Sequence, residues 1–220
     1  MFMVGDGDLV IPGQLIGENV SCLDNCFMEN NRVYSMVFGM VRINGRVVRV
    51  IPSLGVYTPK RDDLVIGVII NVMEGSWIVD INSPYLCRMR GEEATKDVMN
   101  KNLSKYYDVG DRISAKVSFV NEVNSCEITG PWKLIDGVII NVNPKRIPRV
   151  VGKRRSMLEI LKKKTNCNIV VGQNGRIWIR SDNFDNVKLA INAIKRIEKE
   201  AQSSGLTDRI EKMLENARRS

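Results

Sequence analysis

The sequence predicts a multidomain fold of the class β plus α+β. The chain has 220 residues, which is enough for two or three small domains with their own cores. Short β-rich segments separated by turn residues fill residues 1–131, whereas helical periodicity is confined to residues 132–220. We therefore expect a small N-terminal β domain at residues 1–60, a β-barrel at residues 61–131, and an α+β domain with an extra C-terminal helix at residues 132–220.

The first domain is predicted from short strands and their turns. The dipeptide Asn44-Gly45 separates two runs of β-branched residues, at 41–43 and 46–51. Asn and Gly accept the positive φ angles of a tight hairpin turn, so these runs are expected to pair. The turn-rich residues 52–59 then close the domain.

A second set of strands begins at Asp62. We expect five strands, at residues 64–72, 76–81, 86–89, 112–120 and 122–129. A polar excursion, a loop or short helix at residues 92–107, separates the third strand from the fourth. Five strands with one longer excursion predict a small closed barrel of the OB type.

The last third changes from strands to mixed elements. The expected order is a strand at 137–142, a basic turn with a short helix at 146–151, a helix at 156–164, a hairpin of 168–171 and 176–179, an amphipathic helix from near Asp182 or Asp185 to Gly205, and a short final helix capped by Thr207. This order predicts a compact α+β domain.

The net charge of +8 is concentrated in the last third. Residues 1–60 carry five basic and five acidic groups, residues 61–131 carry eight and eleven, and residues 132–220 carry twenty and nine. Such asymmetry favours a polyanionic partner, nucleic acid before an anionic membrane surface. The aliphatic run at residues 64–70 is too short to span a bilayer and no secretory signal is visible, so we expect a cytoplasmic protein without a membrane partner.

The absence of histidine excludes several classes of enzyme. Ser-His-Asp and Cys-His nucleophiles and histidine-ligated metals all need an imidazole. The five cysteines form no CxxC pair, so we expect buried free thiols, with a metal site at Cys22 and Cys26 as the weaker alternative. No nucleotide-binding fingerprint is present, and we expect neither a metal nor another cofactor.

Carboxylates in the barrel are the only candidates for a two-metal nuclease site. They are Asp62, Asp63, Asp80, Glu92, Glu93 and Asp111. They lie at different strand ends without a compact motif, so solvated acids at turns are the favoured interpretation.

The order of elements in residues 137–201 resembles a KH domain, whose signature loop clamps single-stranded nucleic acid. That loop would be VGKRRS, residues 151–156, with Gly152 as its first glycine and Arg155 where a second glycine is usual. The preceding residues resemble an S1 domain, with DLVIGV at 63–68 as its first strand and YDVGDRISAKV at 107–117 leading into its fourth.

A β-rich domain followed by S1 and KH domains resembles the RNA-binding cap subunit of the archaeal-type RNA exosome. Further matches are IPG at 11–13, YTP at 57–59, GQNGRIWI at 172–179 and SGLTD at 204–208. The resemblance covers essentially the whole chain, and it makes the GxNG of residues 172–175 a hallmark of the family.

Thirteen residues are expected to bind RNA. Six positive charges lie within eleven residues and can pair with successive phosphates, although a solvated surface is the alternative; they are Lys145, Arg146, Arg149, Lys153, Arg154 and Arg155. The hairpin turn supplies Gly172, Asn174, Gly175 and Arg176. The alternatives for this turn are a purely structural role or contact with a neighbouring domain.

The barrel supplies the remaining three candidates. Trp77 would stack on a base, or else it is a core residue. Arg88 and Arg90 would line a charged entrance together with Lys96, Lys101 and Lys105. Two interpretations of Lys162, Lys163 and Lys164 stay open: they only face the negative end of a helix dipole, or they also take part in binding. Trp178 is expected in the core.

The resemblance implies a non-catalytic subunit that caps, as a trimer, a hexameric ring of RNase PH-like exosome subunits. Its N-terminal domain would dock on the ring, and single-stranded RNA would be captured and threaded to subunits that degrade it by phosphorolysis. One alternative is a free S1/KH protein, an RNA chaperone or ribosome-associated factor. Another is a metal-dependent nuclease. The zero net charge of residues 1–60 favours the cap, because it suits protein docking better than RNA binding.

Overall fold

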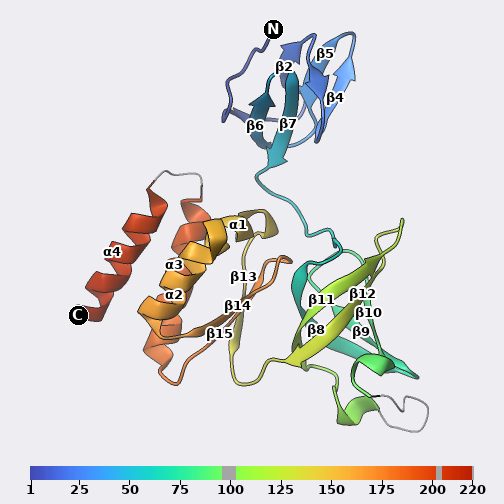
Figure 1. Ribbon diagram of the computed structural model, residues 1–220, viewed down its shortest axis with the longest axis vertical. Coiled ribbons are helices and arrows are strands. Elements are labelled where there is room, and N and C mark those ends of the chain that lie inside the picture. Colours follow the sequence, from blue (N-terminus) through green and yellow to red (C-terminus); the bar gives the residue numbers. More distant parts are fainter. Residues whose placement is uncertain (96–102, 202–204, 220) are drawn as a thin grey trace. The chain divides into compact units, whose positions relative to one another are not determined.

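The computed structural model describes residues 1–95, 103–201 and 205–219 (Figure 1). The chain divides into two compact units, Met1–Gly55 and Val56–Ser220. The division falls after Gly55 rather than after residue 60, and the second boundary that the sequence suggested, after residue 131, lies inside the second unit.

The first unit consists of two small sheets around an apolar core. The sheets have the strand orders β1-β6-β7-β3 and β2-β5-β4. Their strands are β1 (Leu9–Val10), β2 (Leu15–Glu18), β3 (Ser21–Cys22), β4 (Cys26–Glu29), β5 (Arg32–Ser35), β6 (Gly39–Asn44) and β7 (Val47–Pro52). Val41 of β6 pairs with Val50 of β7 and both are buried. The hairpin predicted at Asn44-Gly45 is confirmed, with Gly45 at φ 59°.

Cys22 and Cys26 are joined by a disulfide. The prediction of free thiols was wrong for this pair, because a tight turn with Asn25 at φ 56° brings the ends of β3 and β4 together. Cys87, Cys126 and Cys167 are free and buried, as expected.

The second unit begins with a closed barrel of strand order β10-β12-β11-β8-β9, which confirms the five-stranded barrel. Its strands are β8 (Leu64–Met73), β9 (Ser76–Asp80), β10 (Cys87–Arg90), β11 (Arg112–Val120) and β12 (Cys126–Lys133). The bounds 122–129 predicted for the fifth strand were wrong, because residues 121–125 form the turn between β11 and β12. The parallel pairing of β10 with β12 closes the barrel. Alternate residues of β11, namely Ile113, Ala115 and Val117, point into the core, as the period-2 pattern of a half-buried strand requires. Between β10 and β11 lie the 3-10 turns η1 (Gly91–Glu93) and η2 (Leu103–Lys105).

The α+β domain follows in the predicted order. It contains β13 (Val138–Asn141), η3 (Pro144–Arg146), α1 (Ile147–Val151), η4 (Lys153–Arg155), α2 (Ser156–Thr165), β14 (Asn168–Val171), β15 (Arg176–Arg180), α3 (Phe184–Lys199) and α4 (Leu206–Arg219). Its sheet has the order β13-β15-β14, so β14 is an edge strand. Most predicted bounds agree with these to within one residue, but α3 ends at Lys199 rather than Gly205, and Thr207 lies inside the first turn of α4 rather than capping it.

Both faces of this sheet are covered. Ile177 and Ile179 of β15 belong to the core that includes residues of α1, α2, α3 and α4. Trp178, which alternates with them, packs on the other side against Ile66 of the barrel and Leu134 of the connection. Because successive side chains of β15 point to opposite faces of the sheet, the helices pack on one face and the barrel packs on the other (Figure 1). The expectation that Trp178 is a core residue is confirmed.

No helix among the described residues is both long and apolar enough to cross a membrane.

Candidate nucleic-acid interface

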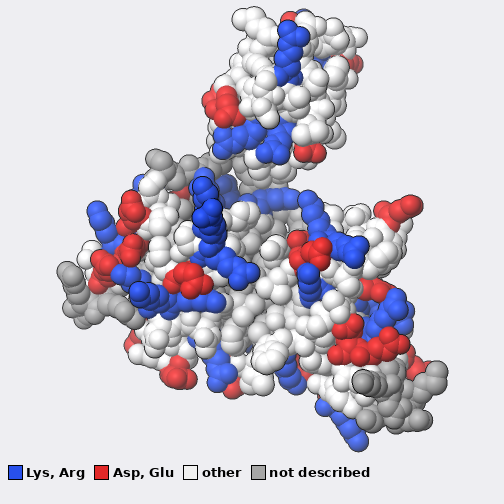
Figure 2. All heavy atoms as spheres, viewed as in Figure 1, with Lys and Arg blue, Asp and Glu red and all other residues white. Residues whose placement is uncertain are grey.

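The basic segment, residues 145–155, surrounds the start of α2 on the α+β domain. Its six cationic side chains are exposed except for Arg146, which is half-buried. Within the described part of the chain, none of the six forms an ion pair. Figure 2 shows Lys and Arg side chains gathered over α1 and α2 on the face in view. Six neighbouring cations in such surroundings produce a positive field that suits a polyanion.

The basic loop, Gly152–Arg155, has a backbone that favours glycine at several positions. Gly152 has φ 74°, and a Cβ there would lie 2.7 Å from the backbone N of Met157. Arg154 and Arg155 have φ 52° and 65°, in the left-handed region. Arg155, at the position where a second glycine is usual in a KH loop, therefore has a backbone conformation that favours glycine.

We expect the substitution Arg155→Gly to separate stability from binding. A left-handed backbone conformation costs a residue with a Cβ about 1 kcal/mol. The free energy of unfolding of Arg155→Gly should therefore exceed that of Arg155→Ala by about 1 kcal/mol, and its urea midpoint should be higher. Both variants remove the same guanidinium and should weaken single-stranded RNA binding equally, by about three- to fivefold. Urea denaturation and fluorescence anisotropy measure the two effects. Equal stability of the two variants would contradict the left-handed assignment.

An apolar pocket adjoins the basic loop. It has a volume of about 320 Å³ and is lined by Pro144, Ile147, Pro148, Val151, Gly152 and Gln173. The pocket combines an apolar lining with the loop's Gly152 at its edge, so a flat apolar group can enter it while an attached anion meets the basic loop.

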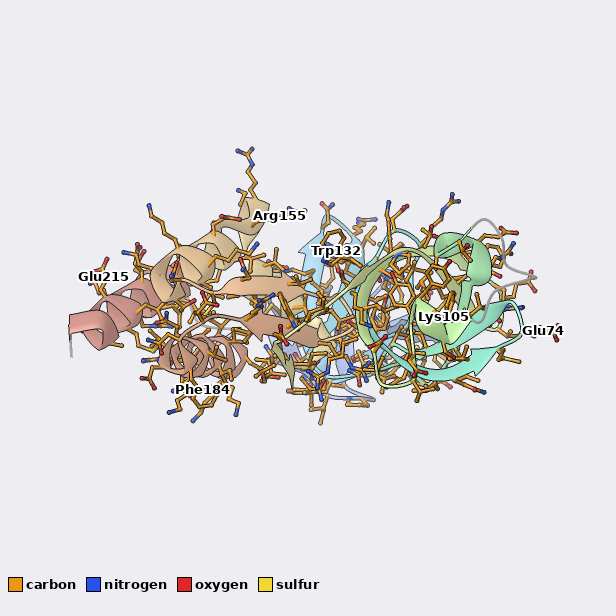
Figure 3. All side chains as sticks on the ribbon, turned by 90° about the horizontal axis from the view of Figure 1, so that it is seen from below. Glu74, Lys105, Trp132, Arg155, Phe184 and Glu215 are labelled. Atoms are coloured by element: carbon orange, nitrogen blue, oxygen red, sulfur yellow. A yellow bond between two sulfur atoms is a disulfide. The ribbon has the colours of Figure 1, made fainter. Side chains whose placement is uncertain are left out.

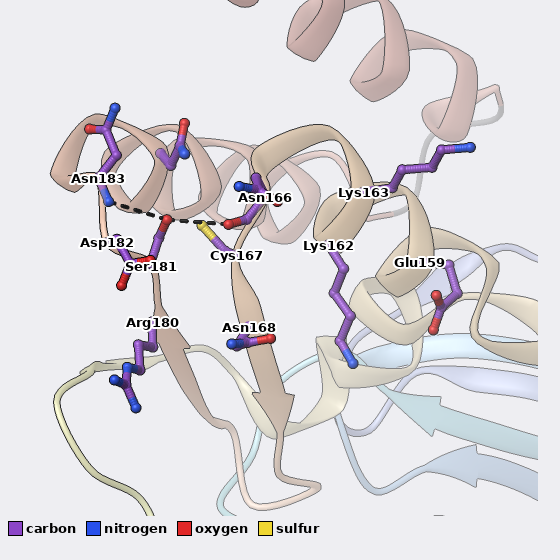
Figure 4. A pocket seen from close by; sticks show the side chains of 11 residues that line it. Glu159, Lys162, Lys163, Asn166, Cys167, Asn168, Arg180, Ser181, Asp182 and Asn183 are labelled. Carbon is purple, nitrogen blue, oxygen red and sulfur yellow. Dashed lines mark hydrogen bonds between the residues drawn. The ribbon is translucent and has the colours of Figure 1, made fainter.

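A larger polar pocket lies between the C-terminal half of α2 and the edge strand β14 (Figure 4). It has a volume of about 900 Å³, and its lining includes Lys162, Lys163, Asn168 and Arg180. Figure 4 shows Asn168 between the side chains of Lys162 and Arg180. Lys164 does not take part, because it pairs with Glu211 and Glu215 of α4. Of the three lysines that the sequence grouped together, Lys162 and Lys163 thus line this pocket, whereas Lys164 is engaged by α4.

The hairpin turn Gly172–Gly175, which we call the Asn174 turn, is buried against the barrel. Asn174 has no exposed surface. Its Oδ1 accepts a hydrogen bond from the backbone N of Ile66 at 3.2 Å, and its Nδ2 donates to the carbonyl oxygens of Ile66 and Ile81, both at 2.8 Å. The backbone N of Gln173 donates to the carbonyl of Leu64, and Asn82 Nδ2 donates to the carbonyl of Asn174. This turn joins the two domains, so Asn174 itself is not available to RNA.

The two glycines of the turn have no room for a side chain. A Cβ at Gly172 would lie 2.3 Å from Asn174 Oδ1, and a Cβ at Gly175, which has φ 84°, would lie 2.3 Å from the carbonyl oxygen of Val142. Both glycines are buried. The geometry therefore favours a contact of this turn with the neighbouring domain over a contact with RNA.

Arg176 reinforces the same contact. Its side chain is 12% exposed and donates to the backbone carbonyl of Asp80 at 2.6 Å and to the Asp80 carboxylate. Burial opposes ionisation of Asp80, but hydrogen bonds from Arg176 and from the Asn82 backbone outweigh it and hold the pKa of Asp80 below its usual value. Arg176 is therefore engaged by the barrel rather than presented to a ligand.

Trp77 is a core residue of the barrel. It has no exposed surface, its Nε1 donates to the carbonyl of Tyr107 at 2.8 Å, and its ring meets the Tyr107 ring edge-on with centroids 5.6 Å apart. The prediction that Trp77 stacks on a base was wrong, because period-2 alternation does not reveal which face of a strand points inward.

Trp132 on β12, in contrast, is 73% exposed, and no role was predicted for it. The only signal for it was the Gly130-Pro131 pair that precedes it.

The expected charged entrance of the barrel is only partly assembled. Arg88 and Arg90 are exposed on β10, but Arg90 forms a two-pronged ion pair with Glu127 of β12. Lys105 lies in η2, whereas Lys96 and Lys101 lie outside the described residues.

Five of the six carboxylates considered for a nuclease have separate partners. Asp62 pairs with Lys116, Asp63 accepts from Tyr57, Asp80 pairs with Arg176, Glu93 accepts from Thr129, and Asp111 pairs with Lys133. Among the described residues, no three Cys, Asp or Glu side chains gather into a group that could hold a metal ion.

Comparisons with known proteins match both units. A family model described as the KH domain matches residues 137–183, and one described as the exosome RNA binding protein RRP4 N-terminal domain matches residues 8–53. The chain is 44% identical to the exosome complex component Rrp4 of Pyrococcus furiosus over 96% of this chain and 84% of that protein. It is 38% identical to the exosome complex component Rrp4 of Methanothermus fervidus over 97% of this chain and 98% of that protein.

A solved structure agrees with these relatives. A crystal structure described as an exosome complex RNA-binding protein superposes with a TM-score of 0.68 at 38% identity, covering 75% of this chain and 98% of its own. Identity at this level over nearly the full length, together with the KH domain, the barrel and the N-terminal domain, settles the family. The chain belongs to the Rrp4 family of exosome complex components.

Proposed function

We propose that this chain is a non-catalytic RNA-binding subunit that caps a ring of RNase PH-like exosome subunits and supplies it with single-stranded RNA. The observation that carries the proposal is the basic segment. Its six cations have no carboxylate partner among the described residues and lie beside an apolar pocket of nucleotide size, on a chain whose relatives are named as exosome components.

RNA capture follows from the charges and the pocket together. Cations that meet successive phosphates release counterions, which makes binding strong and salt-dependent. Sequence-tolerant binding of single strands also needs surfaces on which bases can stack. The apolar pocket at Ile147 and Pro148 offers one such surface next to the basic loop.

The first unit supplies the contact with the ring. It carries four basic and five acidic groups, so it lacks the excess positive charge of the basic segment, and it exposes several large apolar side chains, namely Leu23 (63%), Phe27 (43%), Met28 (53%), Met36 (59%) and Phe38 (38%). Exposed apolar side chains without excess charge suit burial against a protein rather than contact with RNA. A trimer on a hexameric ring would then present three basic segments to one RNA, which raises the effective affinity by avidity.

Native mass spectrometry of the full chain mixed with the RNase PH-like ring proteins tests this proposal. We expect a ring that carries three copies of the chain. The double variant Leu23→Asp, Met36→Asp should not join the ring, because it places two charges in the docking surface.

Phe184→Asp is the matched control. Phe184 is 66% exposed but lies on α3, in the second unit, so this variant should assemble like the wild type. If the wild-type chain forms no complex while it binds RNA alone, the cap is refuted in favour of a free RNA-binding protein.

A further inference from the structure

Trp132 differs from the other two tryptophans in its exposure. Trp77 and Trp178 are 0% and 7% exposed, whereas Trp132 on β12 is 73% exposed. On β12 it is preceded by Gly130-Pro131 and followed by the exposed Lys133, and Ser114 lies opposite it on β11. Trp132 is thus a large flat ring that is exposed beside a small polar residue on the barrel wall.

A β-bulge sets the direction of this ring. Ser114 pairs with Trp132 and Lys116 pairs with Thr129, so Gly130 and Pro131 together oppose Ala115 alone. Gly130 has φ 61°, which a residue with a Cβ rarely adopts. Such a bulge interrupts the alternation of a strand and redirects the side chain that follows it.

The bulge is held in place from both sides. Glu93 Oε2 accepts hydrogen bonds from the Thr129 hydroxyl at 2.7 Å and from the backbone N of Gly130 at 2.8 Å. The Tyr107 hydroxyl donates to the carbonyl of Pro131 at 3.2 Å, and the ring of Tyr107 rests edge-on against the buried Trp77. Trp132 is therefore an exposed side chain on a rigid base, which keeps the entropic cost of using it low.

The ring of Trp132 lies on the same side of the second unit as the basic loop. In Figure 3, Trp132 and Arg155 both lie on the upper side, whereas Phe184 lies on the lower side. The barrel and the KH domain are locked together by the Asn174 turn and by the Arg176–Asp80 pair. The two groups therefore keep a fixed relation to each other.

We propose that Trp132 is a stacking platform for a base of the single-stranded RNA whose phosphates are held by the basic loop. The inference rests on the proposed function and extends it to the barrel. The isolated ring favours a base over a protein partner, since protein docking surfaces are contiguous apolar patches and stacking needs only one accessible π-face.

Fluorescence anisotropy with a dye-labelled oligoadenylate tests the proposal on the full chain. Stacking on one aromatic ring predicts that Trp132→Leu weakens binding by about 5- to 100-fold, with Trp132→Phe in between. The slope of log affinity against log salt should stay unchanged, because no ion pair is removed. An oligomer of the same length with abasic sites should bind wild type and Trp132→Leu equally.

Acrylamide quenching of tryptophan fluorescence gives a second readout. Trp132 supplies the quenchable signal in wild type, and oligoadenylate should protect it. If oligoadenylate binds but neither protects Trp132 nor discriminates the Leu variant, the stacking platform is refuted while the proposed function stands. The platform is also refuted if Trp132→Leu loses binding to the ring proteins and keeps its RNA affinity. If wild type binds no oligoadenylate at all, the proposed function fails as well.

Discussion

Asn174→Ala is expected to lower the free energy of unfolding of the second unit by about 3 kcal/mol. The substitution leaves the backbone N of Ile66 and the carbonyl oxygens of Ile66 and Ile81 without the Asn174 side chain as partner in a buried site. Each buried polar group without a hydrogen bond costs roughly 1–3 kcal/mol. The effect exceeds that of an ordinary surface substitution, which is within about 0.5 kcal/mol.

Asn174→Asp separates hydrogen bonding from shape. Aspartate has the size of asparagine but donates no hydrogen bond when ionised, and it would place a negative charge against two carbonyl oxygens. We expect it to be at least as destabilising as alanine at pH 7. At low pH the protonated aspartic acid can donate one bond, so part of the loss should be recovered there.

Urea unfolding followed by circular dichroism measures both variants, and limited proteolysis reports whether the barrel and the KH domain separate. Gln173→Ala, one residue away, is the matched control, because the exposed Gln173 contacts the barrel through its backbone N. If Asn174→Asp is as stable as wild type, the Asn174 turn does not hold the two domains together.

Removing the three charges of the basic loop is expected to have the largest effect on RNA binding. The triple variant Lys153→Ala, Arg154→Ala, Arg155→Ala removes three exposed cations that pair with no carboxylate in the described parts of the chain. With each phosphate contact contributing up to about 1 kcal/mol, affinity for single-stranded RNA should fall by about 10- to 100-fold at physiological salt. The slope of log affinity against log salt should decrease in magnitude by about 2, which is three contacts at about 0.7 each.

A second triple variant, Lys188→Ala, Lys195→Ala, Lys199→Ala, is the control. It changes the net charge equally but removes exposed lysines of α3. Binding titrations at several salt concentrations should show a small, uniform loss for this control. Equal losses for the two triple variants would mean that net charge, rather than the loop, attracts the RNA.

Local features of the fold were predictable from the sequence. The hairpin at Asn44-Gly45, the five barrel strands, α2 and the turn at Asn174-Gly175 all follow from glycine, asparagine and the spacing of apolar residues. The exposure of the basic loop was predictable as well, because several neighbouring cations at a turn are rarely buried together.

Features set by distant contacts were not predictable. The turn rule identifies Asn174-Gly175 as a turn but says nothing of Ile66 and Ile81, which are far away in the sequence and bury it. Alternation could not distinguish the buried Trp77 from an exposed platform, and the bulge at Gly130-Pro131 interrupts the alternation that would have pointed to Trp132. The disulfide was missed because the spacing of Cys22 and Cys26 alone does not reveal the turn between them.

We expect the basic loop to capture RNA and to supply it to the ring that degrades it. This role is tested by phosphate-dependent degradation of a labelled single-stranded RNA by the RNase PH-like ring alone, with the wild-type chain, and with the basic-loop triple variant. At limiting RNA concentration, the wild-type chain should accelerate degradation by the ring, and the triple variant should assemble but degrade no faster than the ring alone. The proposed role is refuted if the triple variant supports degradation as well as wild type, or if the isolated chain degrades the RNA by itself.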